Sequence, residues 1–173
     1  MAGKKVLCIS AEGFEDTELL CPVNRLLEEG HTVDIAAPGN KEFTGKHGYS
    51  VHPDLSVDDL PPDPATVYDL LLLPGGKAPA TLRKIDSVLE AAKSFDAAGK
   101  PIAAICHGPQ ILITAGLLQG KQATSYTSVA KELKEAGAEY LDQEVVVDGS
   151  YIFSRNPKDI PAFNREIIAQ LRG

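Results

Sequence analysis

Three continuous apolar segments, residues 5–10, 68–73 and 101–105, constrain the fold more than any other feature of the sequence. An unbroken apolar run of this length is typical of a strand that is buried on both faces, as in a parallel sheet covered by helices on both sides. Amphipathic segments lie between the runs, as expected for repeated strand–helix–strand units. We therefore predict an α/β protein with a mostly parallel central sheet between two helical layers.

The remaining elements are predicted from shorter patterns. Further strands are expected at residues 32–37, in a short hairpin within 45–51, and in a second hairpin at 145–147 and 151–154. Helices are expected at residues 16–29, 87–98, 109–115, 129–135 and 157–171. Pro22 predicts a kink or a later start in the first helix. Ser87 with Glu90 fits a capping box, and Asn156 before Pro157 fits a helix start.

Length and charge limit the class of protein and its partners. The chain has 173 residues, of which 43% are hydrophobic, and this suits a single domain over residues 1–173. The formal net charge is −7 and no run of Lys or Arg stands out, which argues against nucleic acid or an anionic membrane as the main partner. The apolar run near the N-terminus is too short for a signal sequence or a membrane span, so we expect a cytoplasmic protein.

The three cysteines, Cys8, Cys21 and Cys106, are expected to be reduced thiols. They form no CxxC pair and no cluster with histidines, so we expect no metal site. The glycine motifs of P-loop and dinucleotide-binding proteins are absent from the sequence, so we expect no cofactor. Cys8, in the middle of a strand, and Cys21 are interpreted as inert core cysteines.

Cys106 stands where a buried strand runs directly into a helix that starts at Pro109. Two small residues, Ala104 and Gly108, lie two positions before and two positions after the thiol. This is the steric pattern of a nucleophile elbow, a strand-to-helix turn so tight that only small neighbours fit. Unpaired N–H groups at the start of the helix favour the thiolate form. We therefore expect Cys106 to be the nucleophile.

His107 follows the nucleophile directly, and the sequence leaves three roles open for it. The ring is the general base for Cys106, or it only stabilises the thiolate electrostatically, or it packs at the helix start. Adjacent side chains on a turn point in different directions, so adjacency alone does not bring the ring to the thiol. The other histidines, His31, His47 and His52, are alternative bases.

An acidic loop follows the first predicted strand, at the end of the sheet where ligands bind in such folds. Within it, Glu15 lies nearest the expected position of Cys106. A like charge nearby would favour the protonated carboxyl, which could donate a hydrogen bond to sulfur or move a proton. Asp16 and Glu18 are interpreted as acids of the first helical turn that complement the helix dipole.

A glycine pair, Gly75-Gly76, ends the strand at residues 68–73. Glycines allow the backbone to approach a ligand closely, and their N–H groups, with that of His107, would form an oxyanion hole. A plain tight turn is the simpler interpretation of the same residues.

These motifs together resemble the DJ-1/PfpI superfamily, within the class I glutamine-amidotransferase-like fold. The matching stretches are Gly13-Phe14-Glu15-Asp16-Thr17-Glu18, Thr44-Gly45-Lys46-His47-Gly48-Tyr49, Leu73-Pro74-Gly75-Gly76, Ile105-Cys106-His107-Gly108-Pro109-Gln110, Thr124-Ser125-Tyr126 and Val145-Val146-Val147-Asp148-Gly149. The resemblance covers essentially the whole chain.

The resemblance implies a flavodoxin-like three-layer sandwich with a strand-to-helix nucleophile elbow. It also implies a set of site residues: Cys106 as nucleophile with His107 beside it, Glu15 hydrogen-bonded to the thiol, Gly75 and Gly76 as oxyanion donors, and Tyr126 lining the site. Members of the family form homodimers or larger rings. Peptidase-like members carry an acid at the position of Ala80, presented to the Cys-His pair of the neighbouring subunit, and alanine cannot orient a histidine.

Three functions are compatible with these residues. The first is a glyoxalase or deglycase, in which Cys106 forms a hemithioacetal with an α-oxoaldehyde or an early glycation adduct and Glu15 moves the proton. The second is an intracellular peptidase or amidase, against which Ala80 counts. The third is a redox-sensing or chaperone-like stress protein without turnover, whose low-pKa thiol is oxidised to a sulfinic acid.

Overall fold

The computed structural model describes residues 2–173 and contains a seven-stranded sheet in the order β10-β11-β7-β6-β1-β2-β5. These strands are β1 Lys5–Ile9, β2 Thr32–Ala37, β5 Leu55–Ser56, β6 Leu70–Leu73, β7 Ile102–Ile105, β10 Val146–Asp148 and β11 Tyr151–Ser154. All neighbouring strands are parallel except β10 and β11, which form the predicted antiparallel hairpin at one edge. The prediction of a mostly parallel sheet is confirmed.

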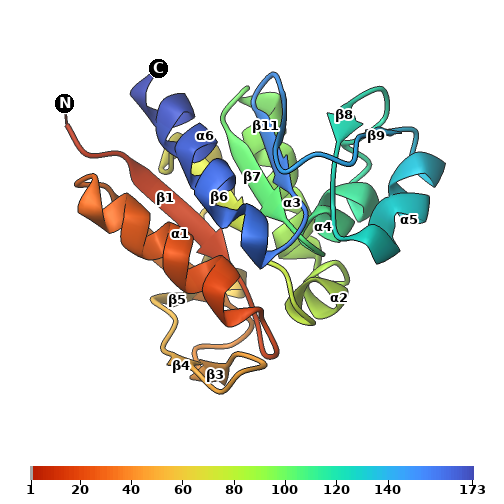
Figure 1. Ribbon diagram of the computed structural model, residues 1–173. Coiled ribbons are helices and arrows are strands. Elements are labelled where there is room, and N and C mark those ends of the chain that lie inside the picture. Colours follow the sequence, from red (N-terminus) through yellow and green to blue (C-terminus); the bar gives the residue numbers. More distant parts are fainter. Residues whose placement is uncertain (1) are drawn as a thin grey trace.

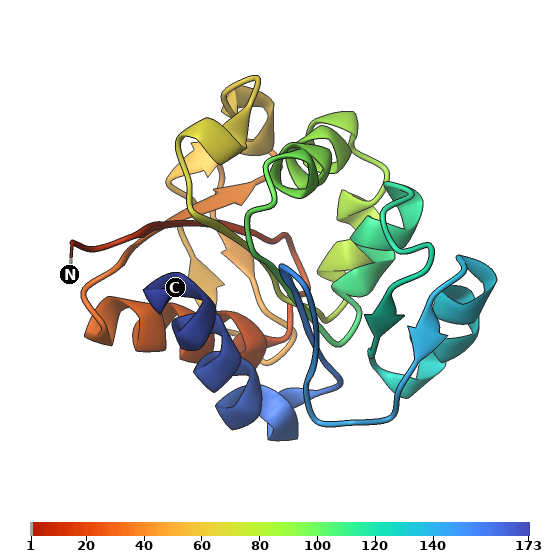
Figure 2. The ribbon, with the colours of Figure 1, turned by 90° about the horizontal axis from the view of Figure 1, so that it is seen from above.

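Helices cover both faces of this sheet, as predicted. Seen from above, α1 and α6 lie on one face and α3 and α4 on the other (Figure 2). The α-helices are α1 Asp16–Glu28, α2 Ala78–Leu82, α3 Asp86–Ala97, α4 Pro109–Thr114, α5 Ala130–Glu135 and α6 Ile160–Arg172. Short 3-10 turns lie at Val57–Asp59, Pro64–Thr66, Thr127–Val129 and Pro157–Asp159.

The central strands β1, β6 and β7 form the core between the two helical layers. Every residue of Leu70–Leu73 and of Ile102–Ile105 is fully buried, which is why these segments are apolar without alternation. The three strands are adjacent and parallel, so their carboxyl ends meet at one end of the molecule. The loops that follow them are thereby brought together.

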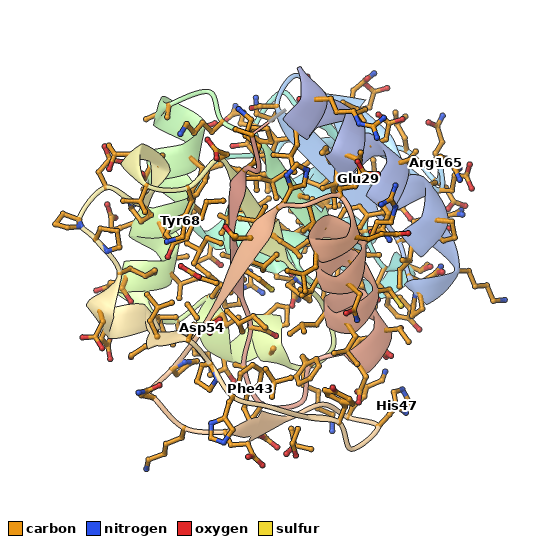
Figure 3. The ribbon with its side chains drawn as sticks, turned by 90° about the vertical axis from the view of Figure 1, so that its left-hand side faces the viewer. Glu29, Phe43, His47, Asp54, Tyr68 and Arg165 are labelled. Carbon is orange, nitrogen blue, oxygen red and sulfur yellow. The ribbon has the colours of Figure 1, made fainter. Side chains whose placement is uncertain are left out.

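The β3–β4 hairpin, Phe43–Thr44 with Ser50–Val51, lies at this same end of the molecule (Figure 1). Figure 3 shows its Phe43 and, from its turn, His47 below the start of α1. The ring of Phe43 packs edge-on against Phe14, with 5.3 Å between the ring centroids. The hairpin therefore closes over the acidic loop that follows β1. A second small sheet pairs β8, Gln122–Ala123, with β9, Glu139–Tyr140.

Several local expectations are corrected. The helix α1 starts at Asp16 and continues through Pro22, so the later start is wrong. The capping box at Ser87 is also wrong, because α3 begins one residue earlier, at Asp86, and places Ser87 within the first turn. Cys21 is exposed rather than in the core, whereas Cys8 is fully buried and burial raises its pKa.

The predicted cap before the last helix is present. The side chain of Asn156 accepts a hydrogen bond of 3.0 Å from the N–H of Lys158. The cap begins the 3-10 turn that leads into α6, so the α-helix itself starts three residues later than expected.

Candidate active site

Three loops meet at the carboxyl ends of β1, β6 and β7. The N–H of Glu15 donates to the carbonyl of Gly75 over 3.2 Å, and the N–H of Lys77 donates to the carbonyl of Gly13 over 2.8 Å. Together the loops enclose a pocket of about 410 Å³. It is lined by Glu15, Glu18, Lys46, Gly76, Lys77, Ala80, Cys106, His107, Gln110, Tyr126 and Pro157. The acidic loop, the glycine pair and the elbow at Cys106 therefore lie around one pocket at this end of the sheet.

Cys106 occupies a nucleophile elbow between β7 and α4. Its φ is +64°, the one positive φ of a non-glycine residue within residues 2–173. A left-handed conformation costs an ordinary residue about 1–2 kcal/mol, so the surrounding structure must hold it there. A Cβ at Gly108 would overlap the carbonyl oxygen of Leu73, which explains why this position is glycine. The turn presents the sulfur to the pocket while leaving the residue only 6% exposed.

Burial works against ionisation of the Cys106 thiol. Burial, and then the nearby charge of Glu18, raise its pKa to about 12, while the N–H groups of Gly76 and His107 lower it. The expectation that the helix start favours the thiolate is therefore not met. The reason is that desolvation of a buried sulfur outweighs the two backbone donors. A nearby base is needed to activate the thiol.

His107 is placed to be that base. Its Nδ1 lies 3.2 Å from Cys106 Sγ, and its Nε2 lies 3.3 Å from the hydroxyl oxygen of Ser128. The ring stacks on Tyr126, with 5.0 Å between centroids and 28° between planes. Burial, followed by the positive charge of Lys46, lowers the pKa of His107, so the ring is neutral at neutral pH. A neutral imidazole can accept the thiol proton.

The other histidines lie outside the pocket lining. His31 Nδ1 accepts a hydrogen bond from the N–H of Lys4, and His52 pairs with Glu42 over 3.1 Å. His47 contacts Glu15 over 3.3 Å at the pocket rim. His107 is the histidine in contact with the thiol.

The carboxyl that affects the pKa of the thiol is Glu18 rather than Glu15. Glu18 is fully buried, and its charge raises the pKa of the Cys106 thiol. Burial and the charge of Glu15 raise the pKa of Glu18 to about 8, so it is neutral at pH 7. Glu15 instead forms an ion pair of 2.9 Å with Lys46. The expected hydrogen bond between Glu15 and the thiol is therefore wrong.

Glu15 and Glu18 have different neighbours because their side chains leave the start of α1 in different directions. Glu15 is the residue before the first helical turn, and its carboxyl reaches outward to the β3–β4 hairpin. Glu18, three residues later, projects from the helix into the space between the β1 and β6 loops. Asp16 accepts hydrogen bonds from the N–H groups of His47 and Tyr49, so these acids do more than complement the helix dipole.

The two glycines after β6 serve different atoms. The N–H of Gly75 donates to Glu18 Oε1 over 3.0 Å and is not free for an oxyanion, which corrects that part of the prediction. The N–H groups of Gly76 and His107 lower the pKa of the Cys106 thiol and so favour negative charge on its sulfur. Gly76 has a φ of +81°, and a side chain there would overlap the backbone of Glu15. These two N–H groups are available to stabilise negative charge at the reacting centre.

Besides Glu18, which was interpreted as an acid that complements the helix dipole, sequence reasoning missed Ser128 and Lys46. Ser128 belongs to the 3-10 turn Thr127–Val129, and Lys46 to the β3–β4 turn; neither element follows a strand of the central sheet. No spacing pattern marks them. Lys46 lies within a matching stretch of the resemblance, which was the one available signal. Tyr126 lines the pocket as expected.

Other features of the surface lack this chemistry. A groove of about 500 Å³ between α1 and α6 is lined by Arg25, Arg165 and Arg172 among others, and its lining contains no nucleophile or carboxylate. Within residues 2–173, no group of three His, Cys, Asp or Glu side chains is arranged to hold a metal ion. In the same range, no helix has the length and apolar character needed to cross a membrane.

The chain is similar to known proteins over nearly its whole length. A model of the DJ-1/PfpI family matches residues 4–170. Deglycase TK1284 of Thermococcus kodakarensis and Deglycase PfpI of Pyrococcus furiosus are each 48% identical over 168 residues, which cover 97% of this chain and 99% of theirs. The solved structure of Schizosaccharomyces pombe DJ-1 is similar with a TM-score of 0.89 at 27% identity, over 96% of this chain and 90% of that one.

Proposed function

We propose that this chain, which belongs to the DJ-1/PfpI family, is a cysteine-dependent deglycase that acts on early glycation adducts and on the α-oxoaldehydes that form them. The named deglycases that match nearly the whole chain support the activity. The contact between Cys106 and His107, and the effect of Glu18 on the pKa of the thiol, support a cysteine as the reacting group. A pocket of about 410 Å³ suits a small carbonyl compound or the modified end of a side chain.

The first step uses Cys106 and His107. As the thiol proton moves to His107 Nδ1, 3.2 Å from the sulfur, the sulfur attacks the aldehyde carbon and a C–S bond forms. The carbonyl electron pair moves to the oxygen, which takes a proton back from the imidazolium and becomes the hydroxyl of a hemithioacetal. The N–H groups of Gly76 and His107 stabilise negative charge at the sulfur before the attack.

The second step moves a proton between the two carbons of the substrate. Glu18 gives its proton to the ketone oxygen and, as the carboxylate, takes the hydrogen of the hemithioacetal carbon as a proton, which leaves an enediol. Glu18 then delivers this proton to the former ketone carbon and takes the hydroxyl proton of the first carbon, so it ends as the neutral carboxyl. The first carbon is thereby oxidised to a thioester and the ketone is reduced to a hydroxyl group. A carboxyl with a pKa of about 8 both releases and takes up a proton near neutral pH, which suits Glu18 as the shuttle.

Water completes the reaction. It attacks the thioester carbon, the C–S bond breaks, and a 2-hydroxy acid leaves while the thiol of Cys106 is restored. With an early adduct, the C–N bond of the aminocarbinol breaks, the amine leaves with a proton, and the same hemithioacetal forms. The repaired amine and the hydroxy acid are then the two products.

The observation that carries this proposal is one buried sulfur that lies 3.2 Å from the imidazole of His107 and whose pKa is raised by the nearby carboxyl of Glu18. We would measure lactate formed from methylglyoxal without glutathione, and the free amine released from methylglyoxal-treated Nα-acetyllysine. Cys106→Ala and Glu18→Gln are expected to lose both products, whereas Glu15→Gln keeps most of the activity. Equal losses in the two glutamine variants would contradict the assignment of Glu18.

Peptide cleavage, measured on casein in parallel, tests the peptidase alternative. Cleavage that depends on Cys106, without lactate, would overturn the deglycase proposal. Oxidation of Cys106 by mild peroxide, with neither lactate formation nor peptide cleavage, would favour a redox sensor.

We also propose a homo-oligomer, because Tyr126 is 43% exposed at the mouth of the pocket, where a second subunit would cover it. The molar mass in solution tests this.

A further inference from the structure

The imidazole of His107 has two side-chain hydrogen-bond partners within residues 2–173, one at each ring nitrogen. Nδ1 faces the Cys106 sulfur at 3.2 Å, and Nε2 faces the hydroxyl of Ser128 at 3.3 Å. A neutral imidazole carries a single hydrogen, so one nitrogen donates and the other accepts. Only the form with its hydrogen on Nε2 leaves a lone pair on Nδ1 for the thiol proton.

We propose that Ser128 is a positioning residue for His107: its hydroxyl oxygen accepts the Nε2 hydrogen and so directs the Nδ1 lone pair at the Cys106 thiol. This role rests on the proposed function in one respect, that His107 takes the proton from Cys106. Ala80 lines the same pocket and offers no polar side-chain atom, so Ser128 supplies the contact to this nitrogen.

The backbone holds Ser128 in register with the elbow. The N–H of Tyr126 donates to the carbonyl of Cys106 over 3.0 Å, and this bond ties the segment to the nucleophile itself. The 3-10 turn that follows is closed by the N–H of Val129, which donates to the carbonyl of Tyr126 over 2.9 Å. The same turn thus places an aromatic ring against the face of His107 and a hydroxyl against its edge.

A hydroxyl at this position has a different electrostatic effect from a carboxylate. Serine adds no negative charge, so it holds the ring without stabilising the imidazolium strongly. The titratable side chains that line the pocket around His107 are Glu15, Glu18, Lys46, Lys77, Cys106 and Tyr126. Lys46 disfavours the imidazolium and Glu18 is neutral at pH 7. The ring of His107 is therefore oriented and stays neutral, which is the form that can accept a proton from the Cys106 thiol.

The test compares four variants with the wild type. Ser128→Ala removes the hydroxyl, Ser128→Thr keeps it, and Ser128→Asp replaces it with a carboxylate. Thr127→Ala is the matched control, because it deletes a hydroxyl from the neighbouring position of the same exposed turn. The kinetic readouts are kcat and KM for lactate formation over a range of pH. The spectroscopic readout is the ¹⁵N shift of each ring nitrogen of His107.

Ser128→Ala is expected to lower kcat about tenfold with KM within about twofold of the wild type, since one orienting hydrogen bond is lost. Its ring nitrogens are expected to show a mixture of the two neutral forms, whereas the wild type shows the hydrogen on Nε2. Ser128→Thr restores both properties. Ser128→Asp moves the acidic limb of the kcat profile to higher pH by about one unit or more, because a carboxylate raises the pKa of a neighbouring imidazole.

Two results would overturn the role of Ser128. One is an unexpected ring state: the wild-type His107 carries its hydrogen on Nδ1, or Ser128→Ala shows the same distribution of the two neutral forms as the wild type. The other is a loss of kcat in Thr127→Ala as large as that in Ser128→Ala, which would mean a disturbed turn. The ring nitrogens are observed without substrate, so this readout decides the role of Ser128 even if the wild type forms no lactate. Absence of lactate would count against the proposed function alone.

Discussion

Glu18 accepts a hydrogen bond of 3.0 Å from the backbone N–H of Gly75 through its Oε1 atom. Its second oxygen, Oε2, is buried and has no nitrogen or oxygen partner within residues 2–173. That oxygen is the one available to carry the proton. A single contact between the first turn of α1 and the loop after β6 therefore determines which carboxyl oxygen is left to carry the proton.

The protonation of Glu18 links its role to the pH dependence of folding. Its pKa rises from 4.5 in the unfolded chain to about 8 in the folded protein, so the folded state holds this proton more tightly. The stability that results is fully present below pH 4.5 and is lost as pH rises toward and through 8, by up to about 1.4 kcal/mol per pH unit. Glu18→Gln lacks this contribution. Urea unfolding at several pH values should show the wild type losing stability relative to Glu18→Gln between pH 5 and 8. A constant difference across that range would contradict the shifted pKa.

The buried thiol of Cys106 should remain protonated across the physiological range. Thiolate absorbance near 240 nm is measured as the difference between the wild type and Cys106→Ser, which removes the contributions of Cys8 and Cys21. We expect no thiolate step between pH 5 and 8, because burial raises the pKa of Cys106 to about 12. A step below pH 7 would show that the N–H groups of Gly76 and His107 outweigh desolvation.

Gly75 is required because two site residues pack against its Cα. A Cβ there would lie 2.6 Å from Glu18 Oε1 and 2.7 Å from the Cβ of Cys106. Gly75→Ala should lower the free energy of unfolding by about 1–3 kcal/mol and reduce lactate formation at least tenfold, since both side chains must shift.

Gly149→Ala is the control, because Gly149 has a φ of +58° and open space around it. It should lose about 1–2 kcal/mol of stability and keep its activity. Full activity in Gly75→Ala would show that the site tolerates the shift.

The segment between β11 and α6 is held by an ion pair with one buried partner. Asp159, only 3% exposed, accepts from Arg155 Nε over 2.8 Å and from a terminal nitrogen over 3.0 Å. Asp159→Asn should lower the free energy of unfolding by about 1–3 kcal/mol, less than for a fully buried pair because Arg155 is partly exposed. Asp142, the exposed partner of the same arginine, provides the control. Asp142→Asn should change stability by less than about 0.5 kcal/mol in the same thermal or urea experiment. Equal effects of the two substitutions would contradict this account.

The class of fold and the nucleophile were predictable because their signals are local. A strand buried on both faces must be apolar along its whole length, so Leu70–Leu73 and Ile102–Ile105 identify the centre of the sheet by themselves. The elbow at Cys106 needs small residues at fixed positions along the chain, and these are visible without any coordinates. The resemblance to a known family rests on the same short stretches.

The division of roles among the acids was decided only by the tertiary structure. Glu15 and Glu18 are separated by less than one helical turn, and no local pattern states which of them faces the thiol. The answer depends on how α1 is rotated against the sheet and on where the β3–β4 hairpin places Lys46. The partner of His107 is likewise a long-range matter, because Ser128 lies 21 residues away in sequence and reaches the ring only once the 3-10 turn docks on the elbow. Burial also reverses the expected charge state of Cys106, since desolvation is a property of the assembled site and cannot be read from neighbours in the chain.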